Sequence, residues 1–205
     1  KGCESILAIE EDDVRVLDEG RFQSKLIDDL INTVVFSPDP ATKEAAGFLI
    51  RRGAAALGIL SSSIQVLYEA MGRKEVSGFT VPAINLRGIT YDTAQAVFRA
   101  AMKGKVGPVL FEIARSEIDY TSQRPFEYTC AVTAAAVKSG WRGPIFIQGD
   151  HFQINAKKFA ADAEKEIQGV KNLIWEAIEA GFYNIDIDTS TLVDLSQPTI
   201  KDQQR

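Results

Sequence analysis

From Gly78 onward, short apolar runs alternate with longer amphipathic segments, and this alternation limits the possible folds more than any other feature. The apolar runs are Phe79–Asn85, Pro108–Ala114, Pro144–Asp150 and Tyr183–Asp188, and the segments between them with helical character are Tyr91–Lys103, Pro125–Lys138 and Ala163–Ala180. Counted from Val81, Val109, Ile145 and Asn184, successive runs are 28, 36 and 39 residues apart. Strands joined by crossover helices pair in parallel, so the pattern predicts a βαβαβαβ unit with a parallel sheet.

Capping residues support these helix boundaries. Thr90 and Asp162 stand where the first and third helices need an N-cap. Gly104, Gly140 and Gly181 follow the three helices, at the position where glycine commonly ends a helix. We therefore expect each helix to begin and end close to these residues.

Residues 1 to about 75 show a different pattern, which predicts helices only. Leu26, Ile27, Leu30, Ile31 and Val34 follow helical spacing. A breaker at residues 37–40 precedes an Ala-rich segment over 41–57, and the serines at 61–63 offer an N-cap for a helix over 64–71. We predict an N-terminal helical extension over 1–75, with docking or oligomerisation as its role. The region over 76–205 contains the alternating strands and helices and is predicted from its strand ends to form part of a barrel.

Each predicted strand ends in polar residues. These are Asn85 and Arg87, Glu112 and Arg115, Asp150 and His151, and Asp186 and Asp188. In barrels and in open α/β sheets alike, ligands bind at the carboxyl ends of parallel strands. No glycine-rich GxGxxG follows any of the strands, which favours a barrel over a dinucleotide-binding sheet. The predicted fold is α/β, the first four β/α units of a (β/α)8 TIM barrel.

Composition narrows the class of partner. The chain has 23 basic and 28 acidic residues, a formal net charge of −5 without long runs of one sign, which argues against nucleic acid and anionic membranes. Cys3 and Cys130 are too few and too far apart for a disulfide framework or a CxxC metal site. No apolar run approaches the roughly 18 residues of a membrane span. We expect a cytoplasmic protein that forms a homo-oligomer.

Asp150-His151 is the candidate functional centre. His151 is the only histidine of the chain, and it follows a buried strand beside an acid. Neutral imidazole is a common metal ligand, and an adjacent carboxylate can act as a general base. A catalytic zinc site normally needs three protein ligands, so we expect further ligands beyond residue 205 and negligible turnover by the 205 residues alone.

Four segments in this order resemble the class II ketose-bisphosphate aldolases, the metal-dependent fructose- and tagatose-bisphosphate enzymes. They are Val81–Asn85, Gly107–Glu112, Gly143–His151 and Ala180–Ser190, and the resemblance covers roughly residues 78–196. It implies a lyase of carbohydrate metabolism, of the kind that acts in glycolysis, which cleaves or condenses a phosphorylated ketose. It also implies a divalent metal, Zn²⁺, that polarises the ketose carbonyl. The predicted strands contain no lysine for a Schiff base, which agrees with the metal route.

The resemblance also assigns roles to residues. Asp150 matches the catalytic acid/base, His151 a zinc-binding histidine, and Asp188 an aspartate near the metal. Asn85 matches a substrate-facing asparagine, and Glu112, Arg115 and Ser190 are the further substrate-binding candidates. A salt bridge of Arg87 or Arg115 with Glu112 or Glu117 is an alternative to anion binding. Asp186 and Asp188 are two residues apart and point to one face of a strand.

Departures from the family pattern leave two alternatives. The third strand reads Gln148-Gly149-Asp150-His151-Phe152 where the family has His-x-Asp-His-Gly, and Thr189-Ser190-Thr191 replaces Gly-Ser-His. Gly149–His151, with Tyr120-Thr121 and Pro125, is also similar to the companion subunit of tagatose-bisphosphate aldolase. The alternatives are a non-catalytic barrel that stabilises a catalytic partner, and a sugar-acid epimerase on the same metal barrel.

Overall fold

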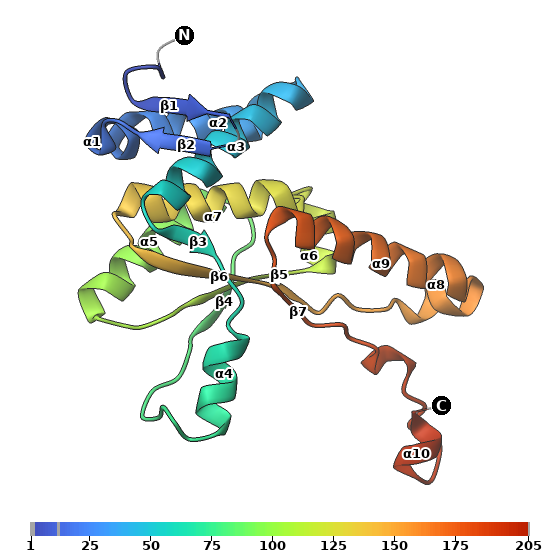
Figure 1. The fold of residues 1–205 in the computed structure, drawn as a ribbon. Coiled ribbons are helices and arrows are strands. Elements are labelled where there is room, and N and C mark those ends of the chain that lie inside the picture. The colour runs from blue at the N-terminus through green and yellow to red at the C-terminus, as the bar shows by residue number, and fades with distance from the viewer. Residues whose placement is uncertain (1–2, 12, 205) are drawn as a thin grey trace.

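The computed structural model describes residues 3–11 and 13–204, and its centre is a parallel sheet (Figure 1). Strands β3 (Ile59–Ser61), β6 (Gly143–Asp150), β5 (Leu110–Ala114) and β4 (Ala83–Asn85) lie side by side in this order, and β7 (Asn184–Ile185) also pairs with β6. Every pairing in this sheet is parallel. The predicted α/β class with a parallel sheet is confirmed.

Three helices follow the strands as the alternation predicts: α5 (Thr90–Gly104), α7 (Pro125–Ser139) and α9 (Ala163–Ala180). Two short helices that the sequence pattern did not predict, α6 (Arg115–Thr121) and α8 (Ala156–Ala161), precede α7 and α9. Asp162 caps α9 by accepting a hydrogen bond from the Lys165 N–H at 3.0 Å, as predicted. Thr90 is not the N-cap of α5: Ile89 holds that position with a φ of 43°, and the Thr90 hydroxyl donates to the Gln123 side chain.

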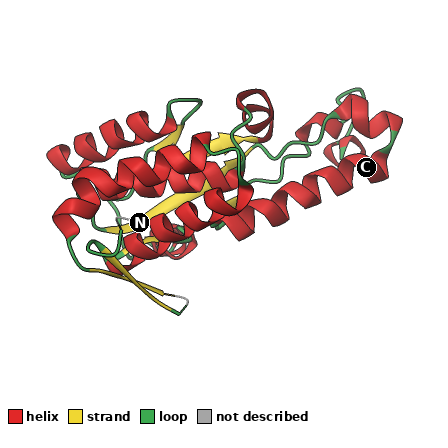
Figure 2. Ribbon diagram, turned by 90° about the horizontal axis from the view of Figure 1, so that it is seen from above, coloured by secondary structure: helices red, strands yellow, loops and turns green. Residues whose placement is uncertain are grey.

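The two faces of the sheet differ in chemistry. One face carries Phe111, Ile113, Ile145 and Ile147, all fully buried against the helical layer that includes α7. Figure 2 shows this layer from above, with the strands lying beneath the helices. The other face is apolar only towards the strand starts, where Leu110 and Phe146 pack on Ile64, beside α4 (Gln65–Gly72). Towards the strand ends this second face becomes polar, so the strands are not apolar on both faces throughout.

The prediction that residues 1–75 form helices only is wrong. β1 (Leu7–Glu10) and β2 (Asp13–Val16) form an antiparallel hairpin, and β3 joins the central sheet. Burial alternates in β2, where Val14 is buried between the exposed Asp13 and Arg15, but in β1 only Leu7 is buried. Strands this short carry too little periodicity to be recognised from the sequence. The remaining elements are α1 (Glu19–Arg21), a π-helical turn over Phe22–Leu26, α2 (Ile27–Phe36) and α3 (Pro40–Ala56).

The N-terminal elements pack directly on the helical layer. α2 and α3 lie on α7, and they share one buried core with the sheet (Figure 1). Close approach depends on a glycine of α3: a Cβ on Gly47 would lie 2.3 Å from the Phe126 ring of α7. A polar link adds to it, since Asp28 accepts hydrogen bonds from both the Tyr91 hydroxyl and the Lys138 ammonium group at 2.6 Å.

The last part of the chain extends away from the sheet. β3 and β7 both pair with the edge of β6 opposite to β5, β3 along the start of β6 and β7 near its end. Beyond them lie a 3-10 turn (Ser190–Leu192) and α10 (Ile200–Gln203), and the Thr199 hydroxyl caps α10 by accepting a hydrogen bond from the Asp202 N–H. Among the described residues, no helix is both long enough and apolar enough to cross a membrane.

Candidate metal centre

Polar side chains form rows across the open face of the sheet, near the carboxyl ends of the strands. The register places Asn85 beside Glu112, Glu112 beside Gln148, and Gln148 beside Asn184. Residues paired in this way point to the same face of a sheet. The next row contains Ala114 beside Asp150. The predicted meeting of polar strand ends at one edge is therefore present in the structure.

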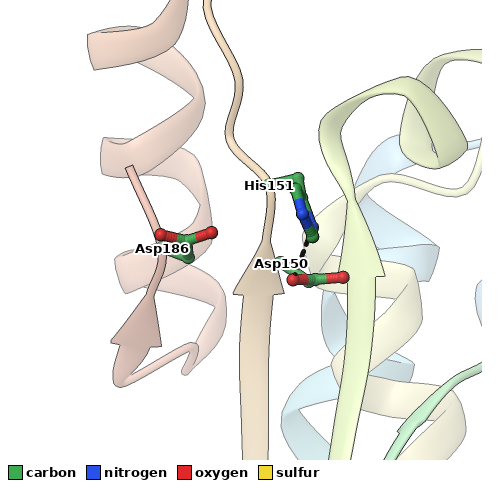
Figure 3. Close-up of side chains that lie close together, drawn as sticks. All are labelled: Asp150, His151 and Asp186. Atoms are coloured by element: carbon green, nitrogen blue, oxygen red, sulfur yellow. Dashed lines mark ion pairs between the residues drawn. The ribbon is translucent and has the colours of Figure 1, made fainter. Parts of the chain in front are cut away.

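A bulge interrupts the end of β6 at Asp150-His151. The Gly149 carbonyl accepts from the Asp186 N–H at 2.8 Å, yet it is the Phe152 N–H, three residues on, that donates to the Asp186 carbonyl at 2.9 Å. A regular parallel ladder would use residue 151, so one extra residue is inserted, and His151 has a φ of 48°. Adjacent residues of a strand normally point to opposite faces, but here Asp150 and His151 contact each other (Figure 3).

Gly149 and Phe152 enclose this bulge. The Phe152 side chain is fully buried, and its ring lies over Gly149, where a Cβ would come within 2.6 Å of the ring. Glycine at 149 is therefore what allows the ring to close over the strand. The structure explains in this way why Gly149 and Phe152 occur on either side of Asp150-His151.

Asp150 and His151 form a close ion pair. His151 Nδ1 lies 2.7 Å from Asp150 Oδ1, and the hydrogen bond to Asp150, with its negative charge, raises the pKa of His151 above 6.5. The His151 side chain is 59% exposed, whereas that of Asp150 is 17% exposed. The imidazole is thus open to a ligand while the carboxylate is largely enclosed by the sheet.

Asp186 completes a cluster with metal-ligand chemistry. One ligand atom each from Asp150, His151 and Asp186 lie within 4.8 Å of one another (Figure 3). Ligand atoms that lie about 2.1 Å from a tetrahedral Zn²⁺ are roughly 3.4 Å from one another. Side-chain rotations that move the ligand atoms of this cluster by about 1 Å would therefore bring them to the distances that an ion requires. Two carboxylates and an imidazole suit Zn²⁺ and other divalent metals. The residues present therefore fit a divalent metal.

Asp188, the aspartate that the resemblance places near the metal, has other partners here. Its carboxylate accepts hydrogen bonds from the Ser190 N–H at 2.8 Å and from the Gln153 side-chain amide. The interactions with Ser190 hold the pKa of Asp188 below 3.8. The β6–β7 register, which pairs Gln148 with Asn184 and Gly149 with Ile185, places Asp186 level with Asp150. The inserted residue then brings His151 to the same point, whereas Asp188 lies farther along, beside Gln153. Ser190 lies with Asp188 and outside the cluster.

Asn85 connects the cluster to β4 and α6. Its side-chain Nδ2 donates to Asp150 Oδ2 at 3.1 Å and to Glu117 Oε2 at 3.2 Å. Glu117 also accepts from the Ala114 N–H at 2.8 Å and forms a salt bridge with Arg87. The predicted alternative for Arg87, an ion pair with Glu117, is thus the one that the structure contains.

Glu112 lies one row behind Asp150 and is 8% exposed. It accepts a hydrogen bond from the Gln148 side chain at 2.8 Å. Burial, followed by the negative charge of Asp150, raises the pKa of Glu112 above 4.5. Glu112 is therefore a largely shielded carboxyl group behind the cluster.

Arg115 is held by a buried acid. Its guanidinium binds Glu166 of α9 at 2.6 and 3.3 Å and the Gln153 carbonyl at 2.8 Å, and the Glu166 side chain is 4% exposed. Arg115 nevertheless lines a cavity of about 140 Å³ beside His151, together with Lys158 and Asn155. The Arg115 guanidinium thus ties the end of β5 to α9 and forms one wall of the space next to the cluster.

Comparison with protein-family models, with curated proteins and with solved structures finds no significant match to this chain. The aldolase resemblance thus stays a prediction, and the site must be judged on its own geometry.

Sequence reasoning found Asp150, His151 and Asn85 but gave too little weight to Asp186 and Glu117. The sequence places Asp186 and Asp188 on one face of a strand, but the aldolase resemblance points to Asp188 as the aspartate near the metal. Which of the two lies at the cluster depends on the pairing register of β6 with β7, which the spacing of apolar residues does not reveal. Glu117 carries a weak signal: it stands at the third position of α6, where a glutamate commonly reaches back to the helix start.

Proposed function

We propose that this protein is a metal-dependent lyase that cleaves or forms a C–C bond in a phosphorylated ketose, on a (β/α)8-type barrel. The observation that carries the proposal is the convergence of Asp150, His151 and Asp186 on one point at the carboxyl-end edge of a parallel sheet. Ligands bind at this edge in barrels. The helix-covered apolar face corresponds to the outer, helix-packed side of such a barrel, and the polar strand ends correspond to the end at which its ligands bind.

In this proposal, His151 and Asp186 hold a divalent metal, with Asp150 beside it. Such an ion, Zn²⁺ by its donor set, would supply Lewis-acid polarisation of a substrate oxygen. Asp150 accepts and returns the proton of the substrate hydroxyl at a carboxylate oxygen. Asn85 binds one oxygen of Asp150 and keeps the carboxylate oriented. The cavity beside His151 receives part of the substrate.

Metal binding tests the first half of the proposal. We expect the metal-free protein to bind one equivalent of Zn²⁺, measured by calorimetry with Co²⁺ absorption as a second readout. His151→Ala should weaken Zn²⁺ binding by at least about 100-fold. Loss of a residue that only hydrogen-bonds to a metal ligand already weakens metal binding by about 10–100-fold, and His151 is itself a proposed ligand. Asp186→Asn should weaken it more than Asp188→Asn; the reverse order would favour the ligand set implied by the aldolase resemblance.

Cleavage of fructose 1,6-bisphosphate by the metal-loaded natural protein tests the second half. Asp150→Asn keeps an oxygen at this position but cannot carry a proton, so we expect the metal to stay bound and the rate to fall by about 10²–10⁴. Unchanged cleavage by Asp150→Asn would refute the acid/base role. Absence of Zn²⁺ binding by the wild-type protein would refute the metal site itself.

A further inference from the structure

The side-chain amide of Asn85 lies between two carboxylates. Nδ2 donates to Glu117 Oε2 at 3.2 Å and to Asp150 Oδ2 at 3.1 Å. An ionised carboxylate only accepts hydrogen bonds, whereas an amide has one donor end and one acceptor end. Turning the Asn85 amide over would bring its carbonyl oxygen against both carboxylates. The two acids together therefore fix which end of the Asn85 amide faces them.

Glu117 is itself held firmly in its ionised form. It is 7% exposed and accepts hydrogen bonds from three donors: the Ala114 N–H, Arg87 and Asn85. Burial by itself would raise the pKa of Glu117, but these hydrogen bonds outweigh it and hold the pKa below 4.5. Glu117 touches neither Asp150 nor His151 through a hydrogen bond, so its connection to the cluster runs through Asn85.

We propose that Glu117 is a positioning residue of the candidate metal centre: with Asp150 it holds the Asn85 amide so that Oδ1 stays available to a hydroxyl group of the ligand. Oδ1 of Asn85 accepts no hydrogen bond from the residues that the structure describes, and Asn85 is partly exposed. The ligand class is a polyhydroxylated molecule bound next to the metal. The class of ligand in this inference rests on the proposed function, whereas the arrangement of Glu117, Asn85 and Asp150 does not.

The first test needs neither metal nor ligand. In the wild-type protein the Asn85 side-chain NH₂ should exchange slowly with water, as measured by ¹⁵N NMR. Glu117→Gln should speed this exchange roughly tenfold, because a hydrogen bond to a charged group is lost. Glu127→Gln is the matched control, since Glu127 holds the same third position in α7 and binds Gln123 instead. Equal Asn85 exchange in the wild type and in Glu117→Gln would overturn the inference.

The second test measures binding of fructose 1,6-bisphosphate to the Zn²⁺-loaded protein by calorimetry. We expect Glu117→Gln and Asn85→Ala each to weaken sugar binding by about tenfold, and the double variant to be no weaker than Asn85→Ala alone. Zn²⁺ affinity should stay within about threefold in Glu117→Gln, because Glu117 contacts no ligand of the metal.

The outcomes separate the inference from the proposed function. Additive losses in the double variant would mean that Glu117 acts independently of Asn85 and would overturn the positioning role. If Glu117→Gln changes Asn85 exchange but the wild-type protein binds neither Zn²⁺ nor the sugar, the positioning of Asn85 stands and the proposed function fails.

Discussion

Replacing Gly149 by alanine tests how the Asp150-His151 bulge is held in place. The added methyl group would lie 2.6 and 2.7 Å from two atoms of the Phe152 ring, which is fully buried. The ring cannot keep its position, and overpacking of a buried site costs about 1–3 kcal/mol. Alanine also restricts the unfolded chain, which offsets about 0.4–1 kcal/mol. We expect a net decrease of about 1–2 kcal/mol in the free energy of unfolding.

Urea unfolding followed by circular dichroism measures this decrease, and a second background isolates its cause. Phe152→Leu removes the ring atoms that the new methyl group would strike. In that background Gly149→Ala should be neutral or should stabilise the protein by up to about 1 kcal/mol. Gly107→Ala is the matched control, because nothing lies within 4 Å of a Cβ at that position. An equal loss from Gly149→Ala in both backgrounds would refute the role assigned to the ring.

Three further predictions concern the charged groups near the cluster. Arg115→Met should lower the free energy of unfolding by about 3–5 kcal/mol in urea titrations, because it leaves Glu166 buried and unpaired, and adding Glu166→Leu should recover most of the loss. The hydrogen bond from Arg115 lowers the pKa of Glu166 below 4.5. The ionised Glu166 therefore stabilises the fold fully above about pH 4.5, and this stabilisation is lost as the pH falls through the pKa of Glu166 in the folded protein. Glu166→Gln should accordingly lower the urea midpoint at about pH 7 more than at about pH 3. In the metal-free protein, the NMR titration of His151 should give a pKa above 6.5 that Asp150→Asn returns towards 6.5, and an unshifted wild-type value would contradict the close ion pair.

The sequence was most informative where periodic burial decides the structure. The apolar runs predicted β4, β5, β6 and β7 in order, and the helices between them end within a residue or two of the predicted positions. A parallel strand covered by helices on one face must be apolar on that face, and a crossover helix must be amphipathic. These requirements are local in sequence, so they can be read without coordinates.

The features that could not be predicted from the sequence depend on contacts between segments that are far apart in the chain. β3 is only three residues long and becomes a strand because Ile59–Ser61 pairs with Gly143–Ile145, more than eighty positions later. Asp186, rather than Asp188, lies beside Asp150 because of the pairing register of β6 with β7, and one inserted residue brings His151 to the same point. A shift of this register, or loss of the inserted residue, would change the members of the cluster. Such shifts change which side chains meet without altering the composition of either segment.

The hydrogen bonds around the cluster separate groups that hold the structure from groups that are open to a ligand. Arg115, Glu166 and Glu117 have several protein partners each, and removing either Arg115 or Glu166 would leave the other as a largely buried charge without its ion-pair partner. Asp186 and the Nε2 atom of His151, by contrast, have no side-chain hydrogen bond to any residue within the described part of the chain. Both stand on the open, polar face of the sheet, directly beside Asp150. The unfilled bonding capacity thus lies at one point, where a divalent metal and a hydroxylated ligand would find their partners.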